Sequence, residues 1–172
     1  MRSLDIPQAN ALETVRQVVR AVDLGVKTAE AIADYTGFSF RHAGYRLHAA
    51  RILGLLRQEG DEAALTPLGE RLVATEPRSE VERSVFYDAI QGSAVIQLLV
   101  PDLLSLVPPE SEVIAERLFH ESKLSRTTSL RRAGGLLSWR RYVFGGATEK
   151  RKRRVTARNE AETQQPVQLS LF

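Results

Sequence analysis

The stretch GFSFRHAGYRLHAARILGLL, residues 37–56 of this 172-residue chain, decides its fold. A glycine turn and a serine N-cap predict a helix over about residues 40–53. One face of that helix carries the small and apolar residues Ala43, Leu47, Ala50 and Gly54. Residues 55–58 then favour a strand, and residues 63–65 favour a return strand after a polar turn. The stretch therefore predicts a helix that leads into a small β-hairpin.

Two helices are expected before this stretch and one directly after the hairpin. Apolar residues recur at helical spacing over about residues 11–24, and a short helix follows over residues 29–35. Thr66 and Pro67 mark the start of the next helix, because a capping residue followed by proline is typical of a helix N-terminus. Three helices followed by a hairpin are the order of a winged helix-turn-helix, which we expect over residues 8–76.

The same residues resemble the winged-helix domains of prokaryotic DNA-binding proteins. In that family a YxLxAAxxLGLL run on the third helix leads into the hairpin, called the wing, and LTxLG opens the next helix. This chain has YRLHAARILGLL at residues 45–56 and LTPLGERL at residues 65–72. The resemblance covers about residues 8–75 and implies that the third helix enters the DNA major groove. Some winged helices bind protein instead, so that alternative stays open.

Residues 77–145 predict a second unit, and the chain as a whole is expected to be mainly α-helical. The helices of this unit are expected over residues 79–90, 94–100, 111–120 and 126–144. The last one, SRTTSLRRAGGLLSWRRYV at residues 125–143, resembles the Ser/Thr- and Arg-rich final helix of prokaryotic DNA-binding modules, some of them associated with restriction systems. This resemblance implies that the last two helices form a second helix-turn-helix-like unit. Trp139 and Tyr142 fit either the core or a dimer contact, so a homodimer stays open.

Basic side chains gather in two stretches without acidic residues, although the chain has 24 Lys and Arg against 21 Asp and Glu. Such segregated charge suggests an anionic partner. In the first stretch, between Asp34 and Glu59, the candidate DNA contacts are Arg41, His42, Tyr45, Arg46, Arg51 and Arg57. In the second, after Glu121, they are Arg126, Thr127, Thr128, Arg131 and Arg132.

The candidates of the first stretch have different expected roles. Arg41 lies near the start of the third helix, where side chains reach base edges, so it is the candidate for base contact. Arg46, Arg51 and Arg57 are placed better for phosphates. Tyr45 fits the core as well as it fits a contact, and the alternative for the arginines is simple solvation.

Residues 146–172 show almost no apolar periodicity, so we expect a disordered tail. Within it, a basic run suits either a mobile phosphate-binding arm or a solubilising linker: Lys150, Arg151, Lys152, Arg153 and Arg154. The last five residues are Gln168, Leu169, Ser170, Leu171 and Phe172. They match at every position the pentapeptide by which bacterial replication and repair proteins dock on the sliding clamp of the replicative polymerase. The resemblance implies clamp binding, with Leu171 and Phe172 in an apolar pocket. The alternative is a segment that folds back on the protein's own core.

Several classes of function find no support in the sequence. The chain has no Cys and only three scattered His, so it offers no thiolate chemistry and no convincing metal cluster. The patterns GxxxxGK[ST], GxGxxG and HExxH are absent. We therefore expect no catalytic residues, no metal and no cofactor. No apolar run approaches the roughly 20 residues of a membrane span, so a cytoplasmic protein is expected.

Together these features predict a non-enzymatic protein that binds double-stranded DNA and docks on the bacterial sliding clamp. It would be cytoplasmic and nucleoid-associated, and it would act in replication, repair or the control of replicating mobile DNA. One alternative is a transcriptional regulator, or a restriction- or defence-system accessory protein whose tail binds another partner. Another alternative is an enzyme subunit whose catalytic chain is encoded elsewhere.

Overall fold

The computed structural model describes residues 5–145, which form eight helices and one two-stranded antiparallel sheet. The first part comprises α1 (Leu12–Asp23), α2 (Ala29–Thr36), α3 (Phe40–Ile52), β1 (Leu56–Glu59), β2 (Glu62–Leu65) and α4 (Pro67–Val73). The second part comprises α5 (Glu80–Gly92), α6 (Ala94–Leu99), α7 (Ser111–Glu121) and α8 (Arg126–Val143). The prediction of a mainly helical chain with a small hairpin is confirmed, and the order of the elements is compatible with a winged helical fold.

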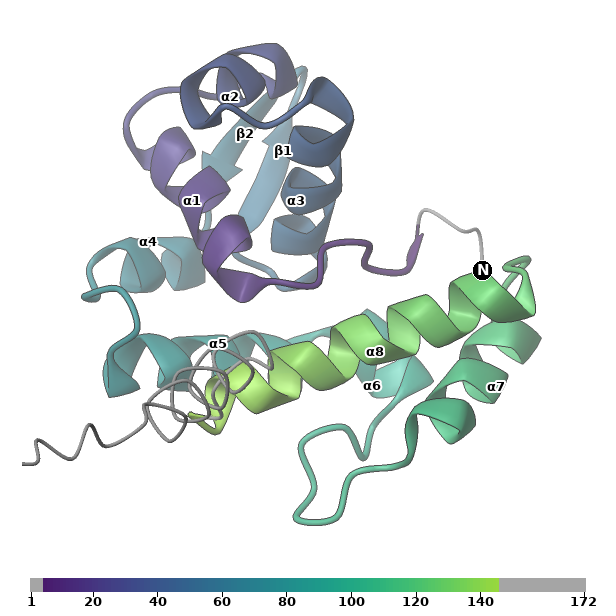
Figure 1. The fold of residues 1–172 in the computed structure, drawn as a ribbon. Coiled ribbons are helices and arrows are strands. Elements are labelled where there is room, and N and C mark those ends of the chain that lie inside the picture. The colour runs from purple at the N-terminus through teal and green to yellow at the C-terminus, as the bar shows by residue number, and fades with distance from the viewer. Residues whose placement is uncertain (1–4, 146–172) are drawn as a thin grey trace, which may run out of the picture.

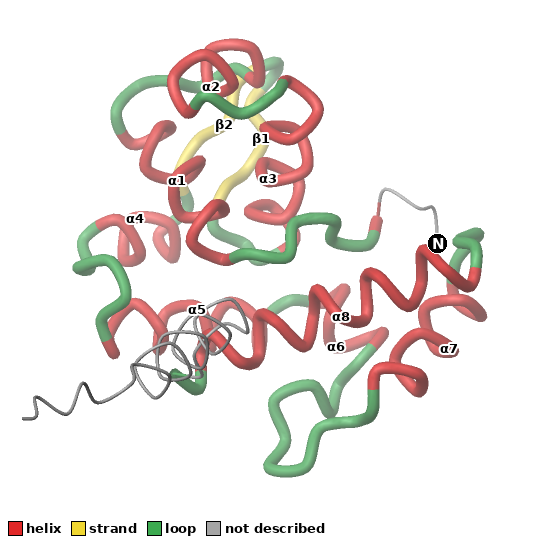
Figure 2. Tube along the Cα trace, viewed as in Figure 1, coloured by secondary structure: helices red, strands yellow, loops and turns green. Residues whose placement is uncertain are grey.

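The elements are arranged in two layers (Figure 1). The upper layer holds α1, α2, α3 and the hairpin, whose strands lie between α1 and α3 (Figure 2). The lower layer holds α5, α6, α7 and α8, and α4 lies at the edge between the layers. The N-terminal segment before α1 passes between α3 and α8, so these two helices face each other across it.

Polar caps begin the helices where the sequence predicts them. Each of these side chains accepts a backbone N–H from the first turn of its helix: Thr28, Ser39, Thr66, Ser79 and Ser125. At the start of α4, Thr66 Oγ1 also donates to the Gly54 carbonyl at 2.6 Å, which ties the helix to the segment before β1. A Cβ atom at Gly69 would lie 2.1 Å from the Leu55 carbonyl oxygen, so only glycine allows α4 to approach this closely.

The hairpin begins one residue later than the sequence predicts. β1 pairs with β2 so that Leu56 lies opposite Leu65 and Glu59 lies opposite Glu62. Leu55, predicted as the first strand residue, instead donates its N–H to the Ala50 carbonyl at 2.9 Å. This bond closes the end of α3 around Gly54, which adopts a positive φ of 67°. Leu55 therefore belongs to the helix C-cap rather than to the strand.

A single cluster of buried apolar residues joins the two layers. Its largest side chains, Phe86 of α5 and Trp139 of α8, are fully buried. Trp139 Nε1 donates to the Ala9 carbonyl at 3.0 Å, which attaches α8 to the N-terminal segment. The sequence allowed Trp139 to be either a core residue or a dimer contact, and the structure places it in the core. The boundary expected near residue 76 falls between α4 and α5, but the core continues across it.

Several predictions concern residues that the structure does not describe. The tail at residues 146–172, its basic run and its terminal pentapeptide lie outside the described residues. None of the described helices is both long and apolar enough to span a membrane.

Candidate nucleic-acid interface

Helix α3 presents Arg41 near its exposed N-terminal end. Ser39 caps the helix by accepting the His42 N–H at 3.3 Å, and both Arg41 and His42 are exposed. The Arg41 Nε–H donates to the hydroxyl of Tyr45, which lies one turn further along the helix. The Arg41 guanidinium lies 5.4 Å from the centroid of the Tyr45 ring. The start of α3 therefore offers a cation whose orientation is set by a neighbouring side chain.

Arg46 and Arg51 of α3 are half-buried. Arg46 Nη1 donates to the His42 carbonyl at 2.9 Å, and its guanidinium lies 4.1 Å from the centroid of the Phe38 ring. Burial lowers the pKa of both guanidinium groups, but an arginine stays protonated at neutral pH. Both side chains thus keep their positive charge at the surface of the helix.

The arginines of α3 differ from many other described cations in having no carboxylate partner. Ion pairs elsewhere in residues 5–145 include Arg16–Glu82, Arg20–Asp23, Lys27–Glu62, Arg57–Glu59, Arg71–Asp88, Arg83–Glu80, Arg117–Asp102 and Arg126–Glu116. Among the described residues, no carboxylate pairs with Arg41, Arg46 or Arg51. Positive charge that is left uncompensated on one helix suits an anionic partner such as a phosphate backbone.

The arginine of the hairpin is compensated. Arg57 Nε donates to Glu59 Oε1 at 2.8 Å, and Arg57 Nη1 donates to the Leu65 carbonyl at 2.9 Å. Arg57 and Glu59 share one face of β1, because residues two apart in a strand point the same way. Asp61 and Glu62 add two exposed acids beside them. The geometry does not favour Arg57 as a phosphate contact. The sequence could have indicated this pair, because Arg57 and Glu59 are two residues apart at the end of a predicted strand and therefore share one face.

The candidates on α8 divide into exposed and buried side chains. Arg126 is exposed, but it pairs with Glu116 at 2.9 Å and lies 4.5 Å from the centroid of the Phe119 ring. Arg132 is only 6% exposed, and its Nη1 donates to the Ile6 carbonyl at 3.1 Å. The geometry does not favour the predicted contact of Arg132 with DNA, because its side chain is buried and bonds to the N-terminal segment.

The remaining candidates on α8 lie near its N-terminus. Thr127 and Arg131 are exposed, whereas Thr128 is half-buried and its Oγ1 accepts the Ser125 hydroxyl at 3.0 Å. Burial lowers the pKa of Arg132, and the charge of the adjacent Arg131 lowers it further. Three α8 arginines were predicted to contact DNA. Arg126 is paired with Glu116 and Arg132 is buried, whereas Arg131 is exposed and has no carboxylate partner among the described residues.

Tyr45 connects the candidates of α3 with those of α8. Its half-buried ring lines a small cavity of about 70 Å³ together with residues 7–10, Arg131, Arg132 and Gly135. We call this place, where α3, α8 and the N-terminal segment meet, the seam. The structure therefore places Tyr45, which binds Arg41, at the same cavity as Arg131, although about ninety positions of sequence separate Tyr45 from Arg131.

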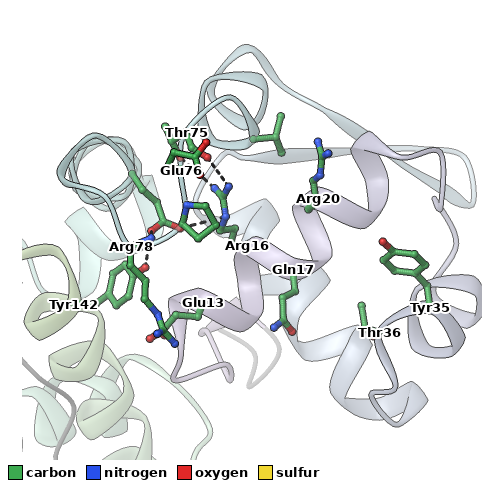
Figure 3. Close-up of a pocket in the computed structure, with 13 residues that line it drawn as sticks. Glu13, Arg16, Gln17, Arg20, Tyr35, Thr36, Thr75, Glu76, Arg78 and Tyr142 are labelled. Carbon is green, nitrogen blue, oxygen red and sulfur yellow. Dashed lines mark hydrogen bonds and ion pairs between the residues drawn. The ribbon is translucent and has the colours of Figure 1, made fainter. Parts of the chain in front are cut away.

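A second feature, which the sequence did not reveal, is a polar network in a wide groove of about 880 Å³ (Figure 3). Glu82 of α5 is fully buried at its base. One carboxylate oxygen of Glu82 lies 3.4 Å from Arg16 Nε, and the other accepts the Tyr142 hydroxyl at 2.7 Å. The backbone N–H of Arg78 also donates to this carboxylate. The network thus joins α1, α5 and α8.

Arg16 extends the network to the end of α4. Its Nη1 donates to the Leu72 carbonyl at 2.8 Å, and its Nη2 donates to the Thr75 carbonyl at 2.6 Å. Burial and the bond to Glu82 raise the pKa of the Tyr142 phenol. Glu82 also lies in the capped first turn of α5. Its N–H does bond to Ser79 at 3.0 Å, but its carboxylate serves the network. These groups bind one another, so we assign the network a structural role.

The described residues contain no group of three or more His, Asp or Glu placed to hold a metal ion. Comparison of the chain with family models, curated proteins and solved structures finds no match. The function is therefore argued from the geometry of α3 and its surroundings.

Proposed function

We propose that this chain is a non-enzymatic winged-helix protein that binds double-stranded DNA through α3. The observation that supports the proposal is that Arg41, Arg46 and Arg51 have no carboxylate partner within residues 5–145, where many other cations have one. α3 is the third helix and directly precedes the hairpin, which is the place of the recognition helix in a winged helix.

Each arginine has a distinct role in this proposal. Arg41 contacts a base edge in the major groove, since the N-terminal residues of a recognition helix reach the bases. Arg46 and Arg51 bind phosphates, because such contacts fix the protein on the duplex without reading sequence. Arg131 extends the phosphate contact from α3 to α8, and Arg57 of the hairpin contributes little.

The second half of the proposal concerns the tail and rests on its sequence. The pentapeptide at residues 168–172 docks on the bacterial sliding clamp, and the basic run at residues 150–154 adds salt-dependent affinity for DNA. The folded part and the clamp then hold the same duplex, which raises the effective concentration of each for the other. Such a protein would act at the nucleoid in replication, repair or the control of replicating mobile DNA.

The DNA-binding half is tested by anisotropy titrations of a labelled duplex with the full chain and its variants. Arg41→Ala should weaken binding about 5- to 150-fold if it removes a bidentate contact to guanine. Arg46→Ala should weaken it less and reduce the slope of log K against log salt by about one. Arg71→Ala is the matched control, because Arg71 is exposed and paired with Asp88, and it should bind as the parent does. Unchanged affinity for both α3 variants would refute the proposal.

The contribution of the basic run is measured by salt dependence. Deleting residues 147–172 should flatten the slope of log K against log salt by up to about 0.9 for each phosphate that the run neutralises in the full chain. Identical slopes for the full and shortened chains would show that the run does not contact DNA.

Clamp docking is tested by calorimetry of a peptide of residues 160–172 against a purified bacterial clamp. We expect micromolar affinity, because a short peptide loses conformational freedom on binding. Replacing Leu171 and Phe172 together by alanine should abolish the signal, since these side chains fill the pocket. A chain that binds DNA but whose peptide shows no heat with the clamp would instead favour a transcriptional regulator or a restriction-system accessory protein.

A further inference from the structure

We propose that Tyr45 is a positioning residue that aims Arg41 at a base edge, and that the second layer of the molecule holds Tyr45 in place through the seam. This inference rests on the proposed function, because it concerns how α3 reads DNA. It adds a determinant of sequence preference that lies between the two layers rather than on the exposed face of one helix.

The first support is the contact between the two side chains. The Arg41 Nε–H donates to the Tyr45 hydroxyl, and the guanidinium lies 5.4 Å from the Tyr45 ring. An arginine has five N–H donors in a planar fork, and the Nε contact occupies one of them. The four donors on Nη1 and Nη2 make no bond to another described residue, and two of these suffice for a bidentate contact to guanine O6 and N7. Tyr45 thus fixes the plane of the fork without blocking its tip.

The second support is the placement of the Tyr45 ring. Tyr45 is half-buried, and it lines the seam cavity together with residues 7–10 and the α8 residues Arg131, Arg132 and Gly135. The N-terminal segment is held there by two bonds from α8, one to the Ile6 carbonyl at 3.1 Å and one to the Ala9 carbonyl at 3.0 Å. Tyr45 therefore borders the place where three segments meet, and this surrounding restricts its side chain in addition to its own helix.

A functional consequence follows from the chemistry of the contact. An unsupported arginine samples many rotamers, and holding it in one plane favours the base whose acceptors match that plane. Phosphate contacts do not depend on this orientation. Loss of the Tyr45 hydroxyl should therefore reduce base preference while it leaves salt dependence and general duplex affinity unchanged.

The experiment selects bound duplexes from a random-sequence pool with the full chain, and the bound fraction is sequenced. The parent should enrich guanine at one position, and Arg41→Ala should remove that enrichment. Tyr45→Phe, which removes only the hydroxyl, should reduce the same enrichment about three- to tenfold, as expected for one hydrogen bond. Tyr35→Phe is the matched control, because Tyr35 is exposed on α2, and it should enrich guanine as the parent does.

The double variant Arg41→Ala/Tyr45→Phe decides whether Tyr45 acts through Arg41. Its base preference should equal that of Arg41→Ala, because the hydroxyl has nothing left to position. Independent effects of the two substitutions would overturn the inference, as would an unchanged preference in Tyr45→Phe or a parent that binds without preferring guanine. In those three cases the proposal of DNA binding survives, whereas a parent that retains no duplex would overturn the proposed function and this inference together.

Discussion

Helices α3 and α8 both carry arginines within stretches that lack acidic residues, yet they place them in different surroundings. The arginines of α3 have no carboxylate partner among the described residues. On α8, Arg132 faces inward to the Ile6 carbonyl, and Arg126 is paired with Glu116. A basic stretch therefore identifies a helix of interest, but the face of the helix decides which of its cations a ligand can reach.

The inward polar atoms of α8 bind other parts of the protein. Arg132 and Trp139 donate to the backbone of the N-terminal segment, and Tyr142 donates to the buried Glu82. Substitutions on this side of α8, or of its partners, should thus change the free energy of unfolding. Substitutions on the exposed face of α3 should change DNA affinity and leave the free energy of unfolding nearly unchanged.

The largest effect is expected at Glu82, which Tyr142 of α8 and Arg16 of α1 both contact. Glu82→Ala should lower the free energy of unfolding by about 3–5 kcal/mol, because it leaves the partly buried Arg16 and Tyr142 without their carboxylate partner. Denaturant titration followed by circular dichroism measures this change. Glu80→Ala on the same helix is the control, since the Glu80 side chain is 94% exposed and its substitution should change stability by no more than about 0.5 kcal/mol. Equal effects of the two substitutions would contradict the structural role of the network.

A smaller effect separates the adjacent residues Arg131 and Arg132. Arg132→Ala should lower the free energy of unfolding by about 1.5–3 kcal/mol, because it removes a charged hydrogen bond to a buried carbonyl. Arg131→Ala should leave stability within about 0.5 kcal/mol, because Arg131 is exposed. In DNA titrations Arg131→Ala should reduce the salt slope by about one if Arg131 binds a phosphate. A stable Arg132→Ala protein with weakened DNA binding would reverse these assignments.

Local features of the fold could be predicted from the sequence, because they depend on neighbouring residues. The caps at Ser39, Thr66 and Ser125 and the hairpin after α3 all follow from short patterns. The contacts that join α8 to the rest of the fold span much longer stretches. The bond from Arg132 to Ile6 joins residues 126 positions apart, and the bond from Tyr142 to Glu82 joins residues 60 positions apart.

The sequence also did not show which side chains polar and charged residues contact when these partners lie elsewhere in the chain. The backbone N–H of Glu82 bonds to the Ser79 cap within its own helix, whereas its carboxylate accepts the hydroxyl of Tyr142 on α8. From the sequence, Tyr45 could be either a core residue or a DNA contact. In the structure Tyr45 is half-buried, and its hydroxyl accepts a hydrogen bond from Arg41. Charge counts and helical spacing cannot separate these cases, because they do not show which helix packs on which face.

The smallest effect is expected at the hairpin, which contrasts with α3 inside the same layer. Arg57→Ala should change duplex affinity less than about twofold, because Glu59 already neutralises this arginine in an exposed pair. Glu59→Ala should raise affinity slightly, since it frees the Arg57 charge and removes an acid near the DNA. Anisotropy titrations at low salt, where surface charges act most strongly, measure both changes. Adding Arg57→Ala to Glu59→Ala should reduce the gain to the part that comes from removing the acid, and the difference between the two variants measures the contribution of the freed cation. A tenfold loss for Arg57→Ala alone would mean that the ion pair opens on binding and that the hairpin contacts DNA as α3 does.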